Sequence, residues 1–345
     1  MKPIFFFLLF LFCIKSYSQK TLVFFGSFNR DKTDEGIYIY ELNTINGKLS
    51  KKSSVRGILN PSFLALSPHG DYLFSCTESK TKNAGSVNSF KIDSEKGKIS
   101  LINNQKSGGE NPVYLSVHKN GKWLINGNYT EGSISVYKIS ENGEIFPFSQ
   151  NLHFEEGSIN PDKQDRSHIH STVFSPNSDY VFAPDLGSDK IRVFKFDENS
   201  DEPLKNFEKQ FPKVTLGSGP RHFIFHPEGK FAYCIEEMGG TISSYKYENG
   251  NLELVQRINA HSEKYKTDFE SSDIHISPDG KFLYASNRGF ENNIAIFKRT
   301  SIGVLLHFYY ALVVKTKSRF LNNSALKNHF KCKPACGKFA GTARR

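Results

Sequence analysis

The sequence predicts an all-β fold, a β-propeller assembled from four-stranded antiparallel blades. The first observation is a turn phrase that occurs five times, starting at residues 67, 118, 175, 226 and 277. These starts lie 51, 57, 51 and 51 residues apart, and a fixed period in this range is typical of repeat architectures. The second observation is composition, because the 345 residues include 31 Phe and 15 Tyr, which favour strands.

Each repeat is expected to contain four short strands joined by tight turns. In the last repeat, an alternating strand over 272–276 precedes the turn at 277–280, where Pro presets φ and Gly accepts a positive φ. Strands are expected next over 281–286 and 294–297, and earlier repeats add a fourth, such as 99–101. A single sheet of this kind cannot bury both of its faces, so the repeats are expected to pack radially around an axis.

The N-terminal part of the chain fits the same scheme as a partial blade. Residues 21–25, 36–40 and 47–50 have the patterns of second, third and fourth strands. The first strand of this blade is therefore expected to come from the far end of the chain, which would close the ring.

Residues 1–18 have the pattern of a secretory signal peptide. A basic start precedes an apolar run over 4–14, and Ser16-Tyr17-Ser18 supplies small residues before a cleavage site at Gln19. The apolar run is too short to cross a bilayer as a helix. We therefore expect export, to a periplasmic or secreted location, with no stable membrane anchor; the alternative is a buried first strand.

The repeat pattern ends near residue 300. Residues 301–345 contain nine Lys or Arg and no Asp or Glu, while the rest of the chain holds 36 basic and 35 acidic residues. The body thus lacks the basic surface that nucleic-acid binding requires. We expect a propeller over 19–300, with no fourth strand after Lys298, and an atypical basic tail over 301–345 that is frameshifted or disordered. A tail that binds a membrane surface or nucleic acid is the alternative.

Several motifs resemble those of the lactonase family of seven-bladed propellers, which includes 6-phosphogluconolactonase and the fungal carboxymuconate-lactonising cyclase. The resemblance covers roughly residues 20–300. It implies a seven-bladed propeller, and the loss of the repeat pattern near residue 300 predicts that this propeller is incomplete at its C-terminus. The motifs are Gly36-Ile37-Tyr38, Ser277-Pro278-Asp279-Gly280-Lys281, Ala285-Ser286-Asn287-Arg288, the run from Ser167 to Pro176 with Pro184-Asp185-Leu186-Gly187, and Gly219-Pro220-Arg221-His222-Phe223 with Glu236-Glu237.

The turn phrase also locates a candidate site. Five residues before it the third and fourth copies carry His170 and Arg221, and eleven residues after its start the fourth and fifth carry Glu237 and Arg288. In an antiparallel pair these two positions lie at the same end, and the first strand of a blade is innermost. The four side chains are therefore expected to meet at one mouth of the ring.

Two further histidines lie close to this set in the sequence. His168 precedes His170 by two residues on the same strand face and is expected to contact substrate. His222 follows Arg221 directly, and strand alternation predicts that it points away from the site. The resemblance carries the proposed active-site groups of the lactonising cyclase, a His, two Arg and a Glu, onto His170, Arg221, Glu237 and Arg288.

The chemistry of this set suits an anionic substrate. Arg221 and Arg288 can bind an anion and stabilise an oxyanion, while Glu237 or His170 can act as general base or acid. The structural alternative is a set of ion pairs between these arginines and Glu237 or Asp185. We expect Asp185 itself to be a turn or packing residue.

The resemblance favours a lactone hydrolase similar to 6-phosphogluconolactonase, acting on a small anionic lactone or sugar acid. A muconate-type lactonising cycloisomerase and a non-catalytic periplasmic binding propeller are the alternatives. We expect no metal and no cofactor, because Arg and His occupy the positions where a calcium-dependent propeller would place carboxylates and amides. Cys76 and Cys234 are expected to be buried thiols.

Overall fold

The computed structural model describes residues 21–29, 31–79, 85–207, 212, 214–312 and 340–343. Within these ranges the regular elements are all β-strands, and they form six four-stranded sheets, here called blades 1 to 6. The all-β prediction is therefore confirmed. Among the residues described there is no helix long and apolar enough to cross a membrane.

The first three blades are built from the N-terminal half of the chain, apart from one strand of blade 1 that comes from residues 340–343. Blade 1 consists of β24 (Ala340–Ala343), β1 (Thr21–Ser27), β2 (Ile37–Leu42) and β3 (Leu49–Val55). Blade 2 consists of β4 (Leu64–Leu66), β5 (Tyr72–Thr77), β6 (Ser86–Asp93) and β7 (Lys98–Lys106). Blade 3 consists of β8 (Pro112–Val117), β9 (Trp123–Asn128), β10 (Ser133–Ile139) and β11 (Ile145–His153).

The other three blades follow in chain order. Blade 4 consists of β12 (Val173–Phe174), β13 (Tyr180–Asp185), β14 (Lys190–Phe196) and β15 (Leu204–Asn206). Blade 5 consists of β16 (Pro220–Phe225), β17 (Phe231–Glu236), β18 (Thr241–Glu248) and β19 (Asn251–Asn259). Blade 6 consists of β20 (Ser271–Ile276), β21 (Phe282–Asn287), β22 (Asn293–Arg299) and β23 (Leu305–Leu312).

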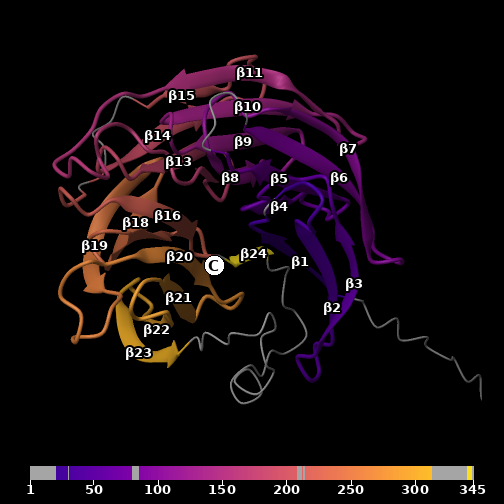
Figure 1. Ribbon diagram of the computed structural model, residues 1–345. Coiled ribbons are helices and arrows are strands. Elements are labelled where there is room, and N and C mark those ends of the chain that lie inside the picture. Colours follow the sequence, from indigo (N-terminus) through magenta and orange to yellow (C-terminus); the bar gives the residue numbers. More distant parts are fainter. Residues whose placement is uncertain are drawn as a thin grey trace, which may run out of the picture.

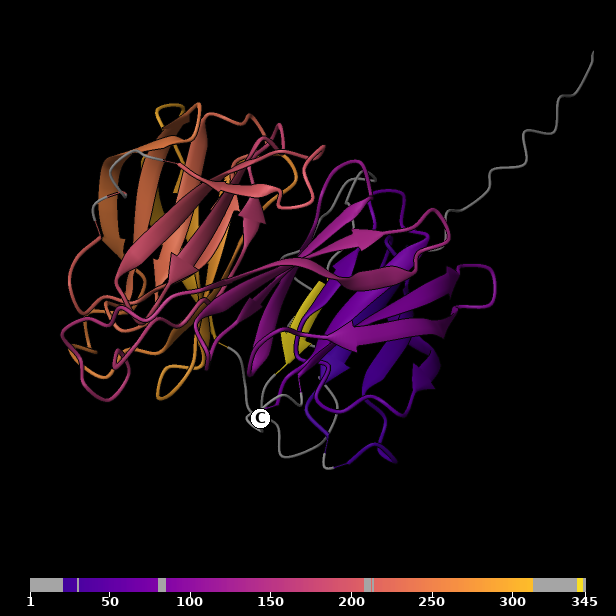
Figure 2. The same ribbon diagram turned by 90° about the horizontal axis from the view of Figure 1, so that it is seen from above.

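The blades are arranged around a common axis. Figure 1 shows the first strand of each sheet toward the middle and the fourth strand at the circumference, and Figure 2 shows the two halves of the chain side by side. In blades 2 to 6 every neighbouring pair of strands is antiparallel. The start of each inner strand and the end of the second strand therefore lie at the same mouth of the ring.

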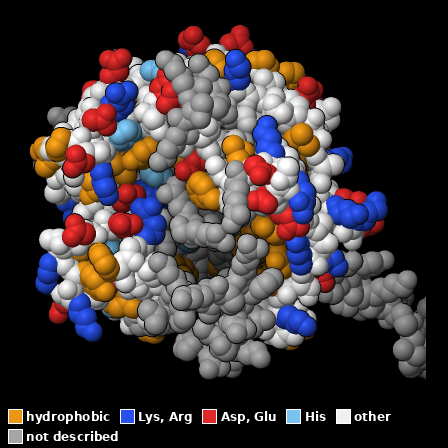
Figure 3. Space-filling model, in the orientation of Figure 1, with side chains coloured by type: hydrophobic (Ala, Val, Ile, Leu, Met, Phe, Trp, Pro, Cys, Tyr) orange, Lys and Arg blue, Asp and Glu red, His pale blue; other side chains and the backbone are white. Residues whose placement is uncertain are grey.

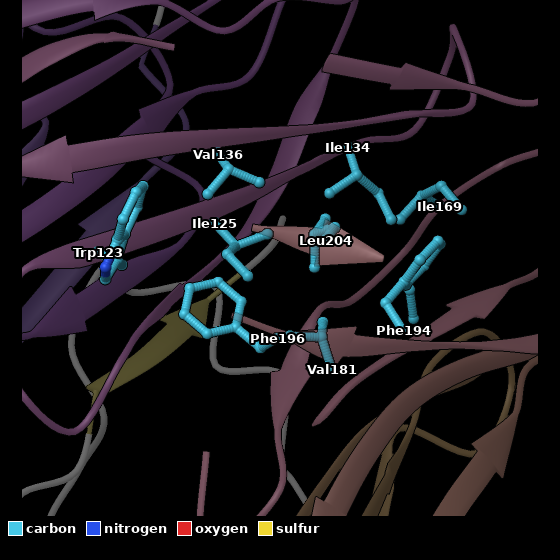
Figure 4. Close-up of a cluster of buried hydrophobic side chains, with 10 residues drawn as sticks. Trp123, Ile125, Ile134, Val136, Ile169, Val181, Phe194, Phe196 and Leu204 are labelled. Carbon is cyan, nitrogen blue, oxygen red and sulfur yellow. The ribbon is translucent and has the colours of Figure 1, made fainter. Parts of the chain in front are cut away.

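The core lies between blades, and each consecutive pair shares one apolar cluster. Figure 4 shows the cluster between blades 3 and 4, where Ile125 and Val136 face Val181 and Phe194. Side chains alternate along a strand, so Phe182, the neighbour of Val181, packs instead in the cluster between blades 4 and 5. A middle strand therefore reads as a continuous apolar run because both of its faces are buried.

The predicted turn chemistry is confirmed at the end of each first strand. Gly70, Gly121, Gly229 and Gly280 all have φ between 70° and 75°, a region that only glycine adopts without strain. In the blade 4 copy, Ser178 takes the glycine position and adopts a φ of 61°.

Two expectations about the ends of the chain need correction. The fourth strand that we expected to be missing after Lys298 is present as β23, which pairs with β22 over 293–312 and carries the last blade past residue 300. A strand from the far end of the chain does lie beside β1, as expected, but β24 runs parallel to it rather than antiparallel. The signal peptide and most of the basic tail lie outside the described residues, so those predictions stay predictions.

Candidate active site

Three inner strands begin with an irregularity at the same register. The pairing of β8, β16 and β20 with the next strand shifts between Pro112 and Tyr114, between Pro220 and His222, and between Ser271 and Ile274. A shift of this kind breaks the strict alternation of side chains. The prediction that His222 points away from the site assumed unbroken alternation, and it is wrong.

Aromatic rings from four blades meet at these strand starts. The ring of His222 lies 5.2 Å from that of His170 and 5.2 Å from that of Tyr114, measured between centroids. The Tyr114 ring in turn lies 4.1 Å from the ring of Phe63. We call this group, together with Arg221 and Asp273, the axial cluster.

Arg221 connects the axial cluster to the predicted carboxylate. Its Nε atom donates to Glu237 Oε2 over 2.8 Å, and its Nη1 atom donates to the carbonyl oxygen of Ser272 over 2.8 Å. The side chain of Arg221 is buried, so the guanidinium is held in one orientation. Ser171 Oγ donates to the backbone carbonyl of Arg221, which ties the strand to blade 4.

Arg288 reaches the same carboxylate oxygen from blade 6. Its Nη2 atom lies 2.8 Å from Glu237 Oε2, and its side chain remains 25% exposed. Lys163 Nζ lies 3.8 Å from the other oxygen, Glu237 Oε1. Two guanidiniums and an ammonium thus surround one carboxylate, which leaves a surplus of positive charge at this mouth.

The environment of Glu237 determines its protonation. Burial alone would raise the pKa of Glu237, but the charges of Arg221 and Arg288 outweigh burial and hold the pKa below its usual value. Glu237 is therefore a carboxylate at neutral pH. Its Oε2 lone pairs are directed at two guanidiniums, so it fixes their positions more readily than it accepts a proton.

His222 and His275 share the carboxylate of Asp273. His222 Nδ1 lies 2.8 Å from Asp273 Oδ1, and His275 Nε2 lies 3.0 Å from Asp273 Oδ2. The backbone N–H of Ile274 also donates to Oδ1. On its other side, His222 Nε2 lies 3.2 Å from Arg221 Nη1.

These contacts shift the three pKa values in different directions. Burial lowers the pKa of His222 to about 4, and the charge of Arg221 acts in the same direction. Burial opposes ionisation of Asp273, but its interactions with His222 and His275 outweigh burial and lower the pKa of Asp273 well below its usual value. Burial likewise opposes ionisation of His275, but the Asp273 carboxylate outweighs burial and raises the pKa of His275. His222 is therefore a neutral imidazole beside two charged groups.

His168 and His170 lie on two sides of Tyr129. The His168 ring stacks on the Tyr129 ring at 4.5 Å, and the His170 ring meets it edge-on at 5.1 Å. His168 Nδ1 lies 2.8 Å from the Tyr129 carbonyl oxygen and Nε2 lies 3.2 Å from Asp165 Oδ1. Both ring nitrogens of His168 thus have protein partners. His170 belongs to the axial cluster through its contact with His222.

The predicted residues are accordingly brought into one connected group. Arg221, Glu237 and Arg288 are in direct contact, and His170 reaches Arg221 by way of His222. Asp185 is fully buried and accepts hydrogen bonds from Ser167 Oγ, the His168 backbone N–H and Arg192 Nε, as expected for a packing residue. Cys76 and Cys234 are buried free thiols, also as expected.

Sequence reasoning missed His222, Asp273 and His275. The signal that could have found the first two is the position four residues before the turn phrase, which carries Phe63, Tyr114, Ser171, His222 and Asp273 in successive blades. Ionisable side chains such as those of His222 and Asp273 are unusual at a position that alternation would bury against a neighbouring blade.

The surroundings of the mouth are mixed in charge. A hollow beside Arg288 is lined also by His261, Phe269 and Phe290. Figure 3 shows acidic and basic side chains interspersed over one face of the molecule, without a large area of one sign. Among the residues that the structure describes, no group of three or more His, Cys, Asp or Glu is placed to hold a metal ion.

Comparisons of the sequence and of the structure with known proteins both find lactonases. The model of a family described as lactonase, 7-bladed beta-propeller, matches residues 22–321. A 6-phosphogluconolactonase from Formosa agariphila is 45% identical over 276 residues, which covers 80% of this chain and 78% of the relative. A 6-phosphogluconolactonase from Bacillus subtilis is 31% identical over 267 residues, covering 76% and 74%. The solved structure of the periplasmic gluconolactonase of Pseudomonas aeruginosa is 29% identical with a TM-score of 0.80, covering 87% of this chain and 85% of that one.

Proposed function

The chain belongs to the lactonase family of seven-bladed β-propellers, and we propose that it is a lactone hydrolase resembling 6-phosphogluconolactonase. The reaction is the opening of a sugar-acid lactone by water at the mouth defined by Arg221, Glu237 and Arg288. Support comes from the two relatives named 6-phosphogluconolactonase, which favour a hydrolase over a cycloisomerase or a binding propeller.

The single observation that carries the assignment to this mouth is the shared carboxylate oxygen. Arg221 and Arg288 both lie 2.8 Å from Glu237 Oε2, although they come from different blades. One carboxylate cannot neutralise two guanidiniums, so the mouth is prepared for a further negative charge. An anionic substrate, or the oxyanion that forms when water attacks a lactone carbonyl, supplies that charge.

The two arginines have different roles in this proposal. Arg288 is partly exposed and borders the hollow lined by Phe269 and Phe290, so it binds the arriving anion. Arg221 is buried and held by Glu237 and the Ser272 carbonyl, so its position is fixed before substrate arrives. A fixed donor stabilises developing charge without reorganisation during the reaction.

Glu237 and the two predicted histidines complete the mouth. Glu237 orients both guanidiniums, in keeping with its lowered pKa. His170 belongs to the axial cluster and contributes an imidazole beside the substrate, whereas His168 supports it through Tyr129. The substrate is a small anionic lactone or sugar acid.

The test is a panel of sugar lactones assayed by proton release. We expect turnover by the wild type, and a loss of about 10²–10³ in kcat for Arg221→Ala, the size observed when one oxyanion donor is removed. Arg288→Ala is expected mainly to raise KM. Lys281→Ala is the matched control, because this exposed cation pairs with Asp279 in the turn at the other end of blade 6. Unchanged kinetics in both arginine variants would refute the assignment to this mouth.

We also propose that the protein is exported. The support is the signal-peptide pattern of residues 1–18, together with the periplasmic gluconolactonase among the structural relatives. Export favours a sugar-acid lactone without phosphate, since phosphorylated sugars are cytosolic. Sequencing the N-terminus of the mature protein is expected to give Gln19 first, and recovery of Met1 from the cytosolic fraction would contradict export.

A further inference from the structure

We propose that Lys163 is a specificity-determining residue, which binds a permanent negative group of the substrate at the edge of the mouth. The inference rests on the proposed function, because it divides the charges of an anionic lactone among the cations of that same site. The group is a carboxylate or a phosphate that the sugar carries in addition to its lactone carbonyl.

Lys163 lies on the longest connection that leads from one blade to the next within blades 1 to 6. This connection, residues 154–172, joins β11 to β12, whereas residues 107–111 and 260–270 make two of the corresponding connections elsewhere. It accounts for the spacing of 57 rather than 51 residues between the second and third copies of the turn phrase. In repeat proteins, extra residues within one repeat form a loop on one face, which is often the binding face.

The backbone around Lys163 is held in a defined conformation. The N–H groups of Asp162 and Lys163 donate to Asn160 Oδ1 over 3.1 and 3.2 Å, and the N–H of Gln164 donates to the Asn160 carbonyl over 2.8 Å. The buried Gln164 side chain donates to the Leu186 carbonyl over 2.8 Å, which ties the loop to blade 4. The loop therefore presents the lysine side chain from a fixed point beside the mouth.

The ammonium of Lys163 lies near Glu237 without being held tightly by it. Nζ is 3.8 Å from Glu237 Oε1, which is beyond hydrogen-bond distance, and the lysine side chain is 46% exposed. The other carboxylate oxygen, Oε2, has Arg221 and Arg288 at 2.8 Å. One carboxylate therefore faces three cations, of which Lys163 and the partly exposed Arg288 can be reached by a ligand.

The charges at the mouth match a substrate that has a negative group of its own. Arg221, Arg288 and Lys163 are positive, and Glu237 supplies a single negative charge among them. The oxyanion that forms at the lactone carbonyl adds one more negative charge, which the fixed Arg221 stabilises. A further negative charge on the substrate would complete the balance, and Lys163 and Arg288 lie where they can bind it.

Two other acidic side chains near the mouth are engaged with partners of their own. Asp165, on the same loop, has Arg166 Nε at 3.1 Å and His168 Nε2 at 3.2 Å. Glu291, beside the hollow, has His261 Nδ1 at 2.6 Å. The surplus of positive charge around Glu237 is thus directed at the substrate.

The first experiment compares lactones that differ in charge. Gluconolactone is neutral, the monolactone of glucaric acid carries a carboxylate, and phosphogluconolactone carries a phosphate. We expect Lys163→Met to lower kcat/KM for the two anionic lactones by about tenfold, as for the loss of one hydrogen bond to a charged group, with little change for the neutral lactone. The anionic lactone with the larger kcat/KM in the wild type identifies the group as carboxylate or phosphate.

Two variants show whether charge is the cause. Lys163→Arg keeps the charge and should retain most of the preference for anionic lactones. Lys281→Met is the matched control, because this exposed cation pairs with Asp279 at the other end of blade 6, and it should leave all three lactones unaffected. A merely structural role for Lys163, acting through Glu237, would lower kcat/KM equally for neutral and anionic lactones. That result, or an unchanged preference in Lys163→Met, would overturn the proposal.

A second measurement does not require turnover. In calorimetric titrations we expect the wild type to bind glucarate, a dicarboxylate, more tightly than gluconate, a monocarboxylate. Lys163→Met should weaken glucarate binding by about tenfold and leave gluconate binding nearly unchanged. Equal affinities of wild type and variant for glucarate would overturn the role of Lys163 and leave the lactonase proposal standing. Lack of wild-type turnover on every lactone would overturn the proposed function, whereas binding that depends on ligand charge and on Lys163 would still support this residue as the anion site.

Discussion

Two consecutive carboxylates at the end of β17 have opposite tasks. Glu236 is buried inside blade 5, where it accepts from Ser243 Oγ and Arg257 Nη2 over 2.8 and 2.9 Å. Glu237 points to the mouth and holds arginines from blades 5 and 6. Because neighbours on a strand face opposite sides, one residue can secure the blade while the next serves the site.

The buried neutral state of His222 predicts a loss of stability in acid. In the unfolded chain this imidazole has the ordinary histidine pKa of about 6.5, whereas burial lowers its pKa to about 4 in the folded protein. Stability from this residue is therefore complete above about pH 6.5 and is lost as pH falls toward about 4. We expect urea unfolding at about pH 5 to show about 2 kcal/mol less stability from this residue than at about pH 8.

The matched variant for this prediction is His222→Gln, which removes the titrating group and should flatten the acid side of the profile. His275 acts in the opposite direction, because its raised pKa gives stability that is lost as pH rises through that value. A profile with the same slope in wild type and variant would show that His222 is not held neutral.

The repeat period alone was enough to predict four residues of this site. Counting from the turn phrase placed His170, Arg221, Glu237 and Arg288 at one mouth, because antiparallel geometry converts equal spacing into equal depth. Counting gave the wrong orientation for His222, because the register shift between Pro220 and His222 places one extra residue in β16. The turn motif contains no sign of this shift. Bulges depend on how two strands pair, so a single strand sequence does not reveal them.

At the scale of the element, the turn after the first strand shows what one glycine contributes. The four glycine copies have φ between 70° and 75°, and Ser178 must adopt 61° in the fifth. A side chain in this left-handed region costs roughly 1 kcal/mol. We expect Ser178→Gly to stabilise the protein by about 0.5–1 kcal/mol, after the extra freedom of the unfolded glycine is subtracted.

The reverse change gives the control. In Gly121→Ala a new Cβ would meet only Pro68 Cδ, at 3.7 Å, so space is not limiting and the cost is that of the backbone alone. This variant should lose about 1 kcal/mol, as measured by the midpoint of urea unfolding. If Ser178→Gly were also destabilising, the serine side chain would have to make a compensating interaction in the folded state.

The strands themselves were largely predictable, and the exceptions have a common cause. The alternation of apolar and polar residues, together with the turn residues, predicted most of the strands, because each blade repeats the same local sequence pattern. β23 was missed because Leu305–Leu312 has neither a turn phrase nor acidic residues and differs in composition from the other fourth strands. Pairing with β22 nevertheless satisfies its backbone, so position in the sheet outweighs composition there.

At the scale of the whole molecule, the described residues form an arc with two different kinds of blade. β9 is buried at every position, and β5, β13 and β17 at every position but the first. By contrast, β1 and β21 alternate between buried and half-buried residues, because blades 1 and 6 share a core cluster with only one neighbour each. Figure 1 shows the arc open between β23 and β2.

The family to which the chain belongs has seven blades, and six four-stranded sheets are described here. The half-buried apolar residues on the two faces that a seventh blade would cover are Val23 and Phe25 on β1, and Phe282 and Tyr284 on β21. The residues of the site that the structure describes come from blades 2 to 6.

This asymmetry predicts the order in which the blades open. Native-state hydrogen exchange should be slowest in β9 and β13, whose blades are packed on both sides, and faster in β1 and β21 by at least about tenfold, or ~1.4 kcal/mol. Comparing second strands matches the length and the position within the sheet, so the difference reports packing between blades. Equal protection in β21 and β13 would show that the two outer faces are covered in solution and that the ring is closed. Faster exchange confined to β1 and β21 would instead establish an open ring whose stability comes from its five shared cores.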